Sequence, residues 1–124
     1  MIEQIPRGTL LGLISSFRNS KGGYSDFIDV YLAKDRRSLF RFGFYWNSLG
    51  YFEVDILSMP SYGSRSSDMH TTHRVSSSRP GGGYKICFGN PSIINSPDIA
   101  RKWAGIWAEL TLDYIKTGKR FPNN

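Results

Sequence analysis

Cysteine and histidine are scarce in this chain of 124 residues, which contains one Cys and two His. A single cysteine excludes an intrachain disulfide and indicates a reducing compartment. Long hydrophobic runs are also lacking, since none approaches the roughly 18 residues of a membrane span. The first residues lack the basic and apolar blocks of a signal peptide. We therefore expect a soluble, cytoplasmic protein that does not enter a membrane.

The chain lacks a long basic run, although 16 basic and 10 acidic residues give it a net charge of +6. Because the basic residues are scattered, a solvated surface or a face for an acidic protein partner is favoured over nucleic-acid binding. Aromatic residues are abundant, with eight Phe, seven Tyr and three Trp. They can build the core of one domain that spans residues 1–124.

The first half of the sequence predicts an antiparallel meander. Its most regular alternation places Phe52, Val54 and Ile56 on one side of a strand, and Glu53, Asp55 and Leu57 on the other. Short polar connections separate this strand from those before it, as in a meander. Four strands are expected at residues 7–17, 26–33, 39–46 and 51–57, and a short extended segment at the sheet edge at residues 69–75.

Residues 96–118 have the features of a long amphipathic helix. Ser96 can cap the helix, Pro97 suits its first position, and Gly118 suits the residue after its end. One apolar stripe contains Ile99, Trp103, Ile106, Trp107, Leu110 and Tyr114. The sequence therefore predicts an α+β fold: a four-stranded antiparallel meander, a cysteine-bearing loop, and a long C-terminal helix packed on the sheet.

Cys87 ends a short strand-like segment, residues 84–87, and Gly89-Asn90-Pro91 then breaks regular structure. A serine- and glycine-rich loop, residues 76–83, precedes the segment. The thiol is therefore expected at the end of an element, facing a loop. Reactive side chains are often placed there, and a thiolate is a good nucleophile and leaving group. The alternative is that Cys87 is a small buried hydrophobic residue.

Three segments carry recognisable motifs. Residues 50–56 lead into the turn Met59-Pro60-Ser61-Tyr62, His73 begins a His-Arg-Val triplet, and residues 83–89 hold Ile86-Cys87 between glycines. With the order of meander, histidine-bearing loop, cysteine and helix, they resemble the core of ubiquitin-conjugating enzymes over about residues 38–121. Residues 107–121 are similar to compact bacterial members of that family from antiphage conjugation operons, which implies a role in antiviral defence.

The resemblance implies that Cys87 is the catalytic cysteine. It would accept a ubiquitin-like protein from an activating enzyme as a thioester and pass it to an amine of a protein acceptor, with no cofactor and no metal. His73 stands where the family's histidine orients the loop by hydrogen bonding. The family's oxyanion-stabilising asparagine is not matched, so Asn90, three residues after Cys87, is the candidate to replace it.

Three other interpretations stay open. The chain could be a non-catalytic binding module of the same fold, acting as a subunit or adaptor, since the His-Pro-Asn triplet of the family is lost. His70 and His73, with Arg74 and Arg79, could form an acid–base pair that cleaves RNA, as in small basic ribonucleases. The two histidines with Cys87 could be imagined as zinc ligands, but they are too few and too loosely spaced for a structural site.

Overall fold

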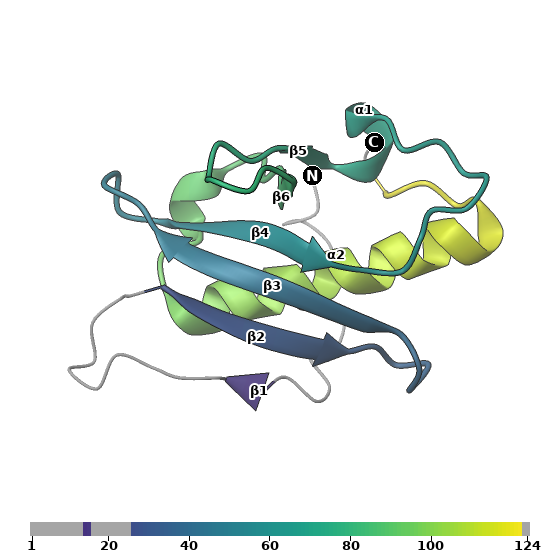
Figure 1. Ribbon diagram of the computed structural model, residues 1–124, viewed down its shortest axis with the longest axis horizontal. Coiled ribbons are helices and arrows are strands. Elements are labelled where there is room, and N and C mark those ends of the chain that lie inside the picture. The colour runs from purple at the N-terminus through teal and green to yellow at the C-terminus, as the bar shows by residue number, and fades with distance from the viewer. Residues whose placement is uncertain (1–13, 16–25, 123–124) are drawn as a thin grey trace.

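A computed structural model describes residues 14–15 and 26–122 of the chain. It contains one six-stranded antiparallel sheet in the order β1-β2-β3-β4-β6-β5, with one long helix, α2, packed across it (Figure 1). The fold is therefore α+β, as predicted. The elements are β1 (Ile14–Ser15), β2 (Phe27–Leu32), β3 (Leu39–Trp46), β4 (Phe52–Ser58), α1 (Met69–Thr72), β5 (Arg74–Ser76), β6 (Tyr84–Ile86), the 3-10 helix η2 (Pro91–Ile93) and α2 (Pro97–Thr117).

The meander predicted from the alternating pattern is confirmed for β2, β3 and β4, which pair with their neighbours in chain order. Their aligned pairs, such as Phe27↔Phe44 and Phe44↔Val54, place large apolar side chains on a common face. Of the strand predicted over residues 7–17, only Ile14–Ser15 lies within the described residues, where it pairs with β2.

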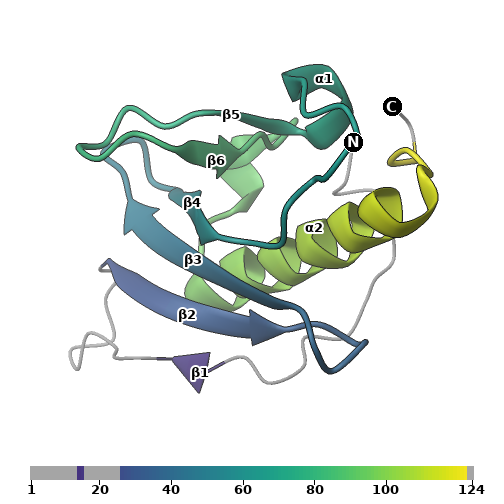
Figure 2. The same cartoon turned by 45° about the vertical axis from the view of Figure 1, so that its right-hand side comes forward.

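The prediction of a four-stranded sheet is wrong in its strand count. The chain returns after β4 and adds β6 directly beside it and β5 outside β6, on the side of the sheet opposite β1 (Figure 2). The prediction of an extended segment over residues 69–75 is also wrong for its first half. Residues 69–72 form the helix α1, because the Asp68 side chain accepts a hydrogen bond from the Thr71 amide and caps it.

The prediction for α2 is confirmed at both ends. The Ser96 hydroxyl accepts a hydrogen bond from the Ile99 amide, and Pro97 occupies the first helical position. Gly118 adopts a left-handed conformation with φ of 81° and donates its amide to the Tyr114 carbonyl. No helix in the described part of the chain is both long enough and apolar enough to span a membrane.

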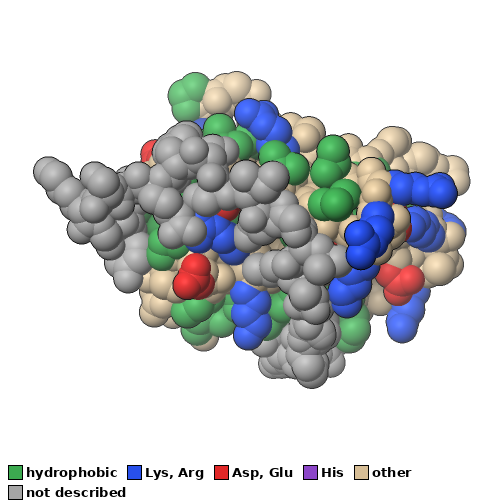
Figure 3. All heavy atoms as spheres, turned by 90° about the horizontal axis from the view of Figure 1, so that it is seen from below, with side chains coloured by type: hydrophobic (Ala, Val, Ile, Leu, Met, Phe, Trp, Pro, Cys, Tyr) green, Lys and Arg blue, Asp and Glu red, His purple; other side chains and the backbone are tan. Residues whose placement is uncertain are grey.

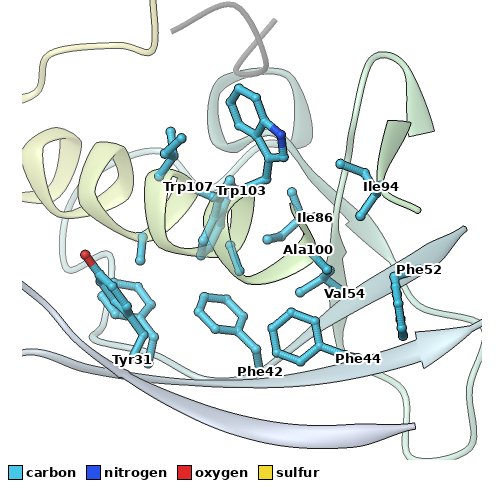
Figure 4. Close-up of a cluster of buried hydrophobic side chains, with 14 of the residues drawn as sticks. Tyr31, Phe42, Phe44, Phe52, Val54, Ile86, Ile94, Ala100, Trp103 and Trp107 are labelled. Atoms are coloured by element: carbon cyan, nitrogen blue, oxygen red, sulfur yellow. The ribbon is translucent and has the colours of Figure 1, made fainter. Parts of the chain in front are cut away.

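The core lies between α2 and the sheet face that it covers. Phe42 and Phe44 point from the strands toward the helix, which carries Trp103 and Trp107, and Phe52 lies at the far end of the same cluster (Figure 4). Four of these side chains are fully buried, and Trp103 is 6 % exposed. The Trp107 ring meets the Phe42 ring edge-on, with 6.2 Å between centroids. Aromatic burial is therefore the main contribution to the stability of this face.

Two polar contacts also join the helix to β2. Arg101 of α2, nearly buried, donates from Nε to Asp29 at 2.5 Å. Tyr31 donates its hydroxyl to Glu109 of α2, also at 2.5 Å. Because a buried charge is costly without its partner, the first contact fixes where α2 lies along the sheet.

Candidate functional site

Cys87 directly follows β6 and is half-buried. Its amide donates to the His73 carbonyl at 2.8 Å, which extends the β5–β6 pairing Arg74↔Ile86 by one step. The thiol is free of disulfide bonding. The structure therefore brings Cys87 to the end of a strand and beside His73, and the contact between the two residues is through the backbone.

His73 is held in a strained backbone conformation. It ends α1 with φ of 54° and ψ of 41°, in the left-handed region that non-glycine residues rarely occupy. Its ring stacks on Phe121, with 4.6 Å between centroids and 7° between planes. Phe121 is buried, so the last described residues of the chain fix the orientation of this imidazole. Such strain persists only where surrounding contacts over-determine it.

Asn90 is exposed and lies in the loop that leads from Cys87 to η2. Its Oδ1 accepts a hydrogen bond from the Ser92 hydroxyl at 2.9 Å. Its Nδ2 makes no hydrogen bond with another residue of the described chain. The loop is anchored at its far end, because the Phe52 amide of β4 donates to the Ile94 carbonyl at 2.7 Å. Asn90 thus has a donor to offer from a loop with a fixed end.

Cys87 lines a small pocket of about 140 Å³ at the junction of β4, β6 and the following loop. Most of the lining is apolar, but the pocket also holds Glu53 and Lys85, whose Oε1 and Nζ atoms lie 3.1 Å apart. Neither His73 nor Asn90 is among its described lining residues. The full lining is Tyr51, Phe52, Glu53, Val75, Lys85, Ile86, Cys87, Phe88 and Pro91.

Glu53 is the most connected carboxylate of this pocket. It accepts hydrogen bonds from Asn47, Lys85 and Arg79, each at 3.1 Å. Burial raises the pKa of Glu53, but these three donors outweigh it and hold the pKa below its usual value of 4.5. At neutral pH the pocket therefore contains an ionised carboxylate beside an ammonium group.

A second set of charges lies on the same sheet face and fixes the β5–β6 loop. Asp55 is 5 % exposed and accepts two hydrogen bonds from the Arg79 guanidinium and one from the Ser77 hydroxyl. Hydrogen bonding to Asp55 holds the pKa of Arg79 above its usual value. The guanidinium also stacks over Tyr45, at 4.3 Å from the ring centroid. That ring lies flat over Gly43, where a Cβ atom would come within 2.6 Å of the Tyr45 hydroxyl.

The two arginines named with the histidines for RNA cleavage both make contacts within the fold. Arg74 stacks between the Tyr62 and Tyr84 rings, at 4.8 and 3.8 Å from their centroids. Arg79 is bound by Asp55 as described above. Within residues 14–15 and 26–122, no group of three or more His, Cys, Asp or Glu side chains is arranged to hold a metal ion.

Glu53 and Lys85 were not singled out from the sequence as site residues. The signal for Lys85 was the alternation of residues 84–87, which places it on the same side of the strand as Cys87. Glu53 had no comparable signal, because its closeness to Cys87 depends on β6 pairing with β4, thirty residues earlier in the chain.

Comparison with known proteins gave no match: no family model fits the chain, and neither the curated proteins nor the solved structures include a similar one.

Proposed function

We propose that Cys87 accepts the C-terminal acyl group of a ubiquitin-like protein as a thioester and transfers it to an amine. The observation that carries the proposal is the placement of the thiol. It is half-buried at the end of β6, in a pocket that combines apolar walls with the Lys85–Glu53 ion pair. The succession of sheet, cysteine, short loop and long packed helix agrees with the resemblance to ubiquitin-conjugating enzymes.

The first step is a thioester exchange. The Cys87 thiolate attacks the carbonyl carbon of the ubiquitin-like protein, which arrives as a thioester on its activating enzyme. The new C–S bond forms, the old one breaks, and the thiolate of the activating enzyme leaves. Lys85, two residues before Cys87, lines the same pocket and is paired there with Glu53.

In the second step, an acceptor amine attacks the thioester carbonyl. An amide bond forms, the Cys87 thiolate leaves, and the attacking nitrogen loses one proton. Each step passes through an oxyanion that needs a hydrogen-bond donor. Asn90 Nδ2 supplies this donor in the proposal. The proton that the nitrogen loses passes to solvent water.

A second candidate is the non-catalytic binding module of the same fold. Its support is that His73 stacks on Phe121 and that the family's triplet asparagine has no counterpart beside it. The interpretation as a conjugating enzyme implies a ubiquitin-like protein, its activating enzyme and a protein acceptor as partners, whereas the binding module would present its sheet or helix to a partner protein. The link to bacterial antiviral defence depends on the resemblance of residues 107–121 alone.

The test is a non-reducing gel of the tagged protein, purified from cells that naturally make it, beside Cys87→Ala and Cys87→Ser. We expect a heavier wild-type band that a reducing thiol removes and that Cys87→Ala lacks. Cys87→Ser should give an oxyester band that resists the thiol and is cleaved by mild hydroxide. The mass of the released chain identifies the ubiquitin-like protein and separates a thioester from a mixed disulfide.

Asn90→Ala is the matched variant for the oxyanion step, because it leaves the thiol in place. It should form the thioester more slowly by about 10- to 100-fold while keeping the same unfolding temperature. Single unmodified bands for wild type and both cysteine variants would instead assign Cys87 a structural role and favour the binding module.

A further inference from the structure

A second pocket lies far along α2 from Cys87, at the C-terminal end of that helix. It has a volume of about 400 Å³, within the range of small-molecule sites. Its lining is polar and basic, unlike that of the Cys87 pocket, and includes Ser64, Arg65, Ser66, Thr71, Gly118 and Arg120. We infer that this basic pocket binds the phosphate group of a small phosphorylated molecule.

Arg65 is held in place by the end of the helix. Its Nε donates to the Ile115 carbonyl at 3.2 Å and its Nη2 to the Lys116 carbonyl at 3.4 Å. The guanidinium lies against Gly118, where an added Cβ would be 2.8 Å from Nη1. These contacts occupy one edge of the guanidinium, and Nη1 makes no hydrogen bond with another described residue. A pre-positioned guanidinium with a spare nitrogen is a favourable phosphate donor.

Arg120 supplies a second guanidinium from the segment after α2. Its Nη2 donates to the Thr71 hydroxyl at 3.4 Å, which links the pocket wall to α1. Of the three hydroxyls that line the same space, those of Ser66 and Thr71 donate to Asp68, and that of Ser64 makes no hydrogen bond with another described residue. A phosphate has several acceptor oxygens, so an arrangement of two guanidiniums and the Ser64 hydroxyl suits it.

One acidic residue borders the pocket and lowers its positive charge. Asp68 accepts hydrogen bonds from the Ser66 hydroxyl at 2.6 Å and the Thr71 hydroxyl at 3.1 Å. Hydrogen bonding, from Ser66 first, lowers the pKa of Asp68 from 3.8 to about 2, so it is ionised at neutral pH. The two arginines outweigh it, and the local charge stays positive.

The surrounding surface strengthens the attraction for anions. Lys and Arg side chains gather at the end of the molecule where α2 terminates (Figure 3). The β2–β3 connection adds the exposed Lys34, Arg36 and Arg37, and it is bound to the helix end through Lys116 and Asp35, 2.9 Å apart. Such a field raises the local concentration of anions. The concave pocket then selects a compact phosphate rather than an extended strand.

The experiment is a titration of the ¹⁵N-labelled full chain with inorganic phosphate, adenosine monophosphate and a single-stranded RNA oligomer, followed by amide chemical shifts. We expect the two small phosphates to shift amides in residues 64–71 and 118–120. Arg120→Gln should weaken that binding by about 10-fold or more, since a charge-assisted hydrogen bond is lost. Arg37→Gln is the matched control, because it also removes one positive charge at the end of the molecule where α2 terminates. It should change the phosphate affinity by less than about twofold.

Ser64→Ala provides a second variant in case Arg120→Gln does not fold. Its hydroxyl makes no hydrogen bond with another described residue, so its loss should weaken phosphate binding without lowering the unfolding temperature. The inference is overturned if phosphate shifts no amides in these segments. It is also overturned if the RNA oligomer binds most tightly and Arg37→Gln weakens binding as much as Arg120→Gln, because a diffuse basic surface then explains the result.

Discussion

The two faces of the sheet are stabilised in different ways. The face under α2 is filled by fully buried aromatic rings such as Phe42, Phe44 and Trp107. The opposite face carries a network of charges, in which Arg79 joins Asp55 to Glu53 and Lys85 bonds Glu53. The strand β4 contributes side chains to both faces. Phe52 and Val54 lie on the helix-covered face, and Glu53 and Asp55 lie on the opposite face.

The difference shows how this chain separates stability from chemistry. Apolar burial is non-directional and close-packed, so the helix-covered face, which also holds the buried Arg101–Asp29 pair, serves the fold. Charged side chains cost desolvation and are retained where they set geometry. On the outer face they hold the β5–β6 loop and place charges beside Cys87. This comparison yields three predictions, from the largest expected effect to the smallest.

Truncation of the helix-covered face should have the largest effect. Trp107→Ala should lower the free energy of unfolding by about 3–5 kcal/mol, since it leaves a cavity beside Phe40 and Phe42. Urea unfolding followed by circular dichroism measures the change. Trp107→Phe is the control: it keeps a six-membered ring, loses the rest of the indole and the hydrogen bond from Nε1 to the Thr72 carbonyl, and should cost less than the alanine substitution.

Substitutions on the outer face, the sheet face opposite α2, should lower the free energy of unfolding less. Asp55→Ala leaves Arg79 without its main partner, and we expect a loss of about 2 kcal/mol because Glu53 still accepts from that guanidinium. Asp113→Ala, an exposed acidic position on α2, serves as the control and should change stability by less than about 0.5 kcal/mol. If Asp55→Ala lowered the free energy of unfolding as much as Trp107→Ala, the charge network would stabilise the fold as strongly as the core. The proposed difference between the two faces would then be wrong.

The pH dependence of stability should differ between the faces in a smaller but diagnostic way. The folded-state pKa of Glu53 lies below 4.5, so its contribution is present above pH 4.5 and is lost as pH falls through the folded-state pKa. The stability difference between wild type and Glu53→Gln should therefore be constant near pH 7 and shrink below pH 4.5. The difference between wild type and Trp107→Phe should stay level over the same range. A level profile for Glu53→Gln contradicts this role for the carboxylate.

Local sequence patterns predicted those helices and strands that are determined by residues within them or directly beside them. Ser96, Pro97 and Gly118 mark the ends of α2, β-favouring composition indicated β2 and β3, and alternation gave β4 with its facing directions. The helix α1 was missed because it has only four residues, and part of its support comes from Trp107, which donates to the Thr72 carbonyl. Pairing of β6 with β4 was missed for the same reason: it depends on distant residues.

The same distinction between local and long-range causes applies to the candidate site. The position of Cys87 after a short strand followed from the residues around it, whereas the placing of His73 near it was implied only by the family resemblance. The Glu53–Lys85 pair and the binding of Arg79 to Asp55 are long-range, and no local pattern reports which charges will meet. The catalytic roles of Cys87, His73 and Asn90 stay predictions.

The outermost strand β5 has only three residues, Arg74–Ser76. His73 breaks the extended backbone on one side, and on the other the Ser77 amide donates to the Gly83 carbonyl, on the side of the neighbouring strand β6, at 2.9 Å. Few main-chain groups are thus left for another chain to pair with, which protects this edge from aggregation by strand addition. A partner protein that approaches here has to be recognised by side chains, and that makes the choice of partner depend on sequence.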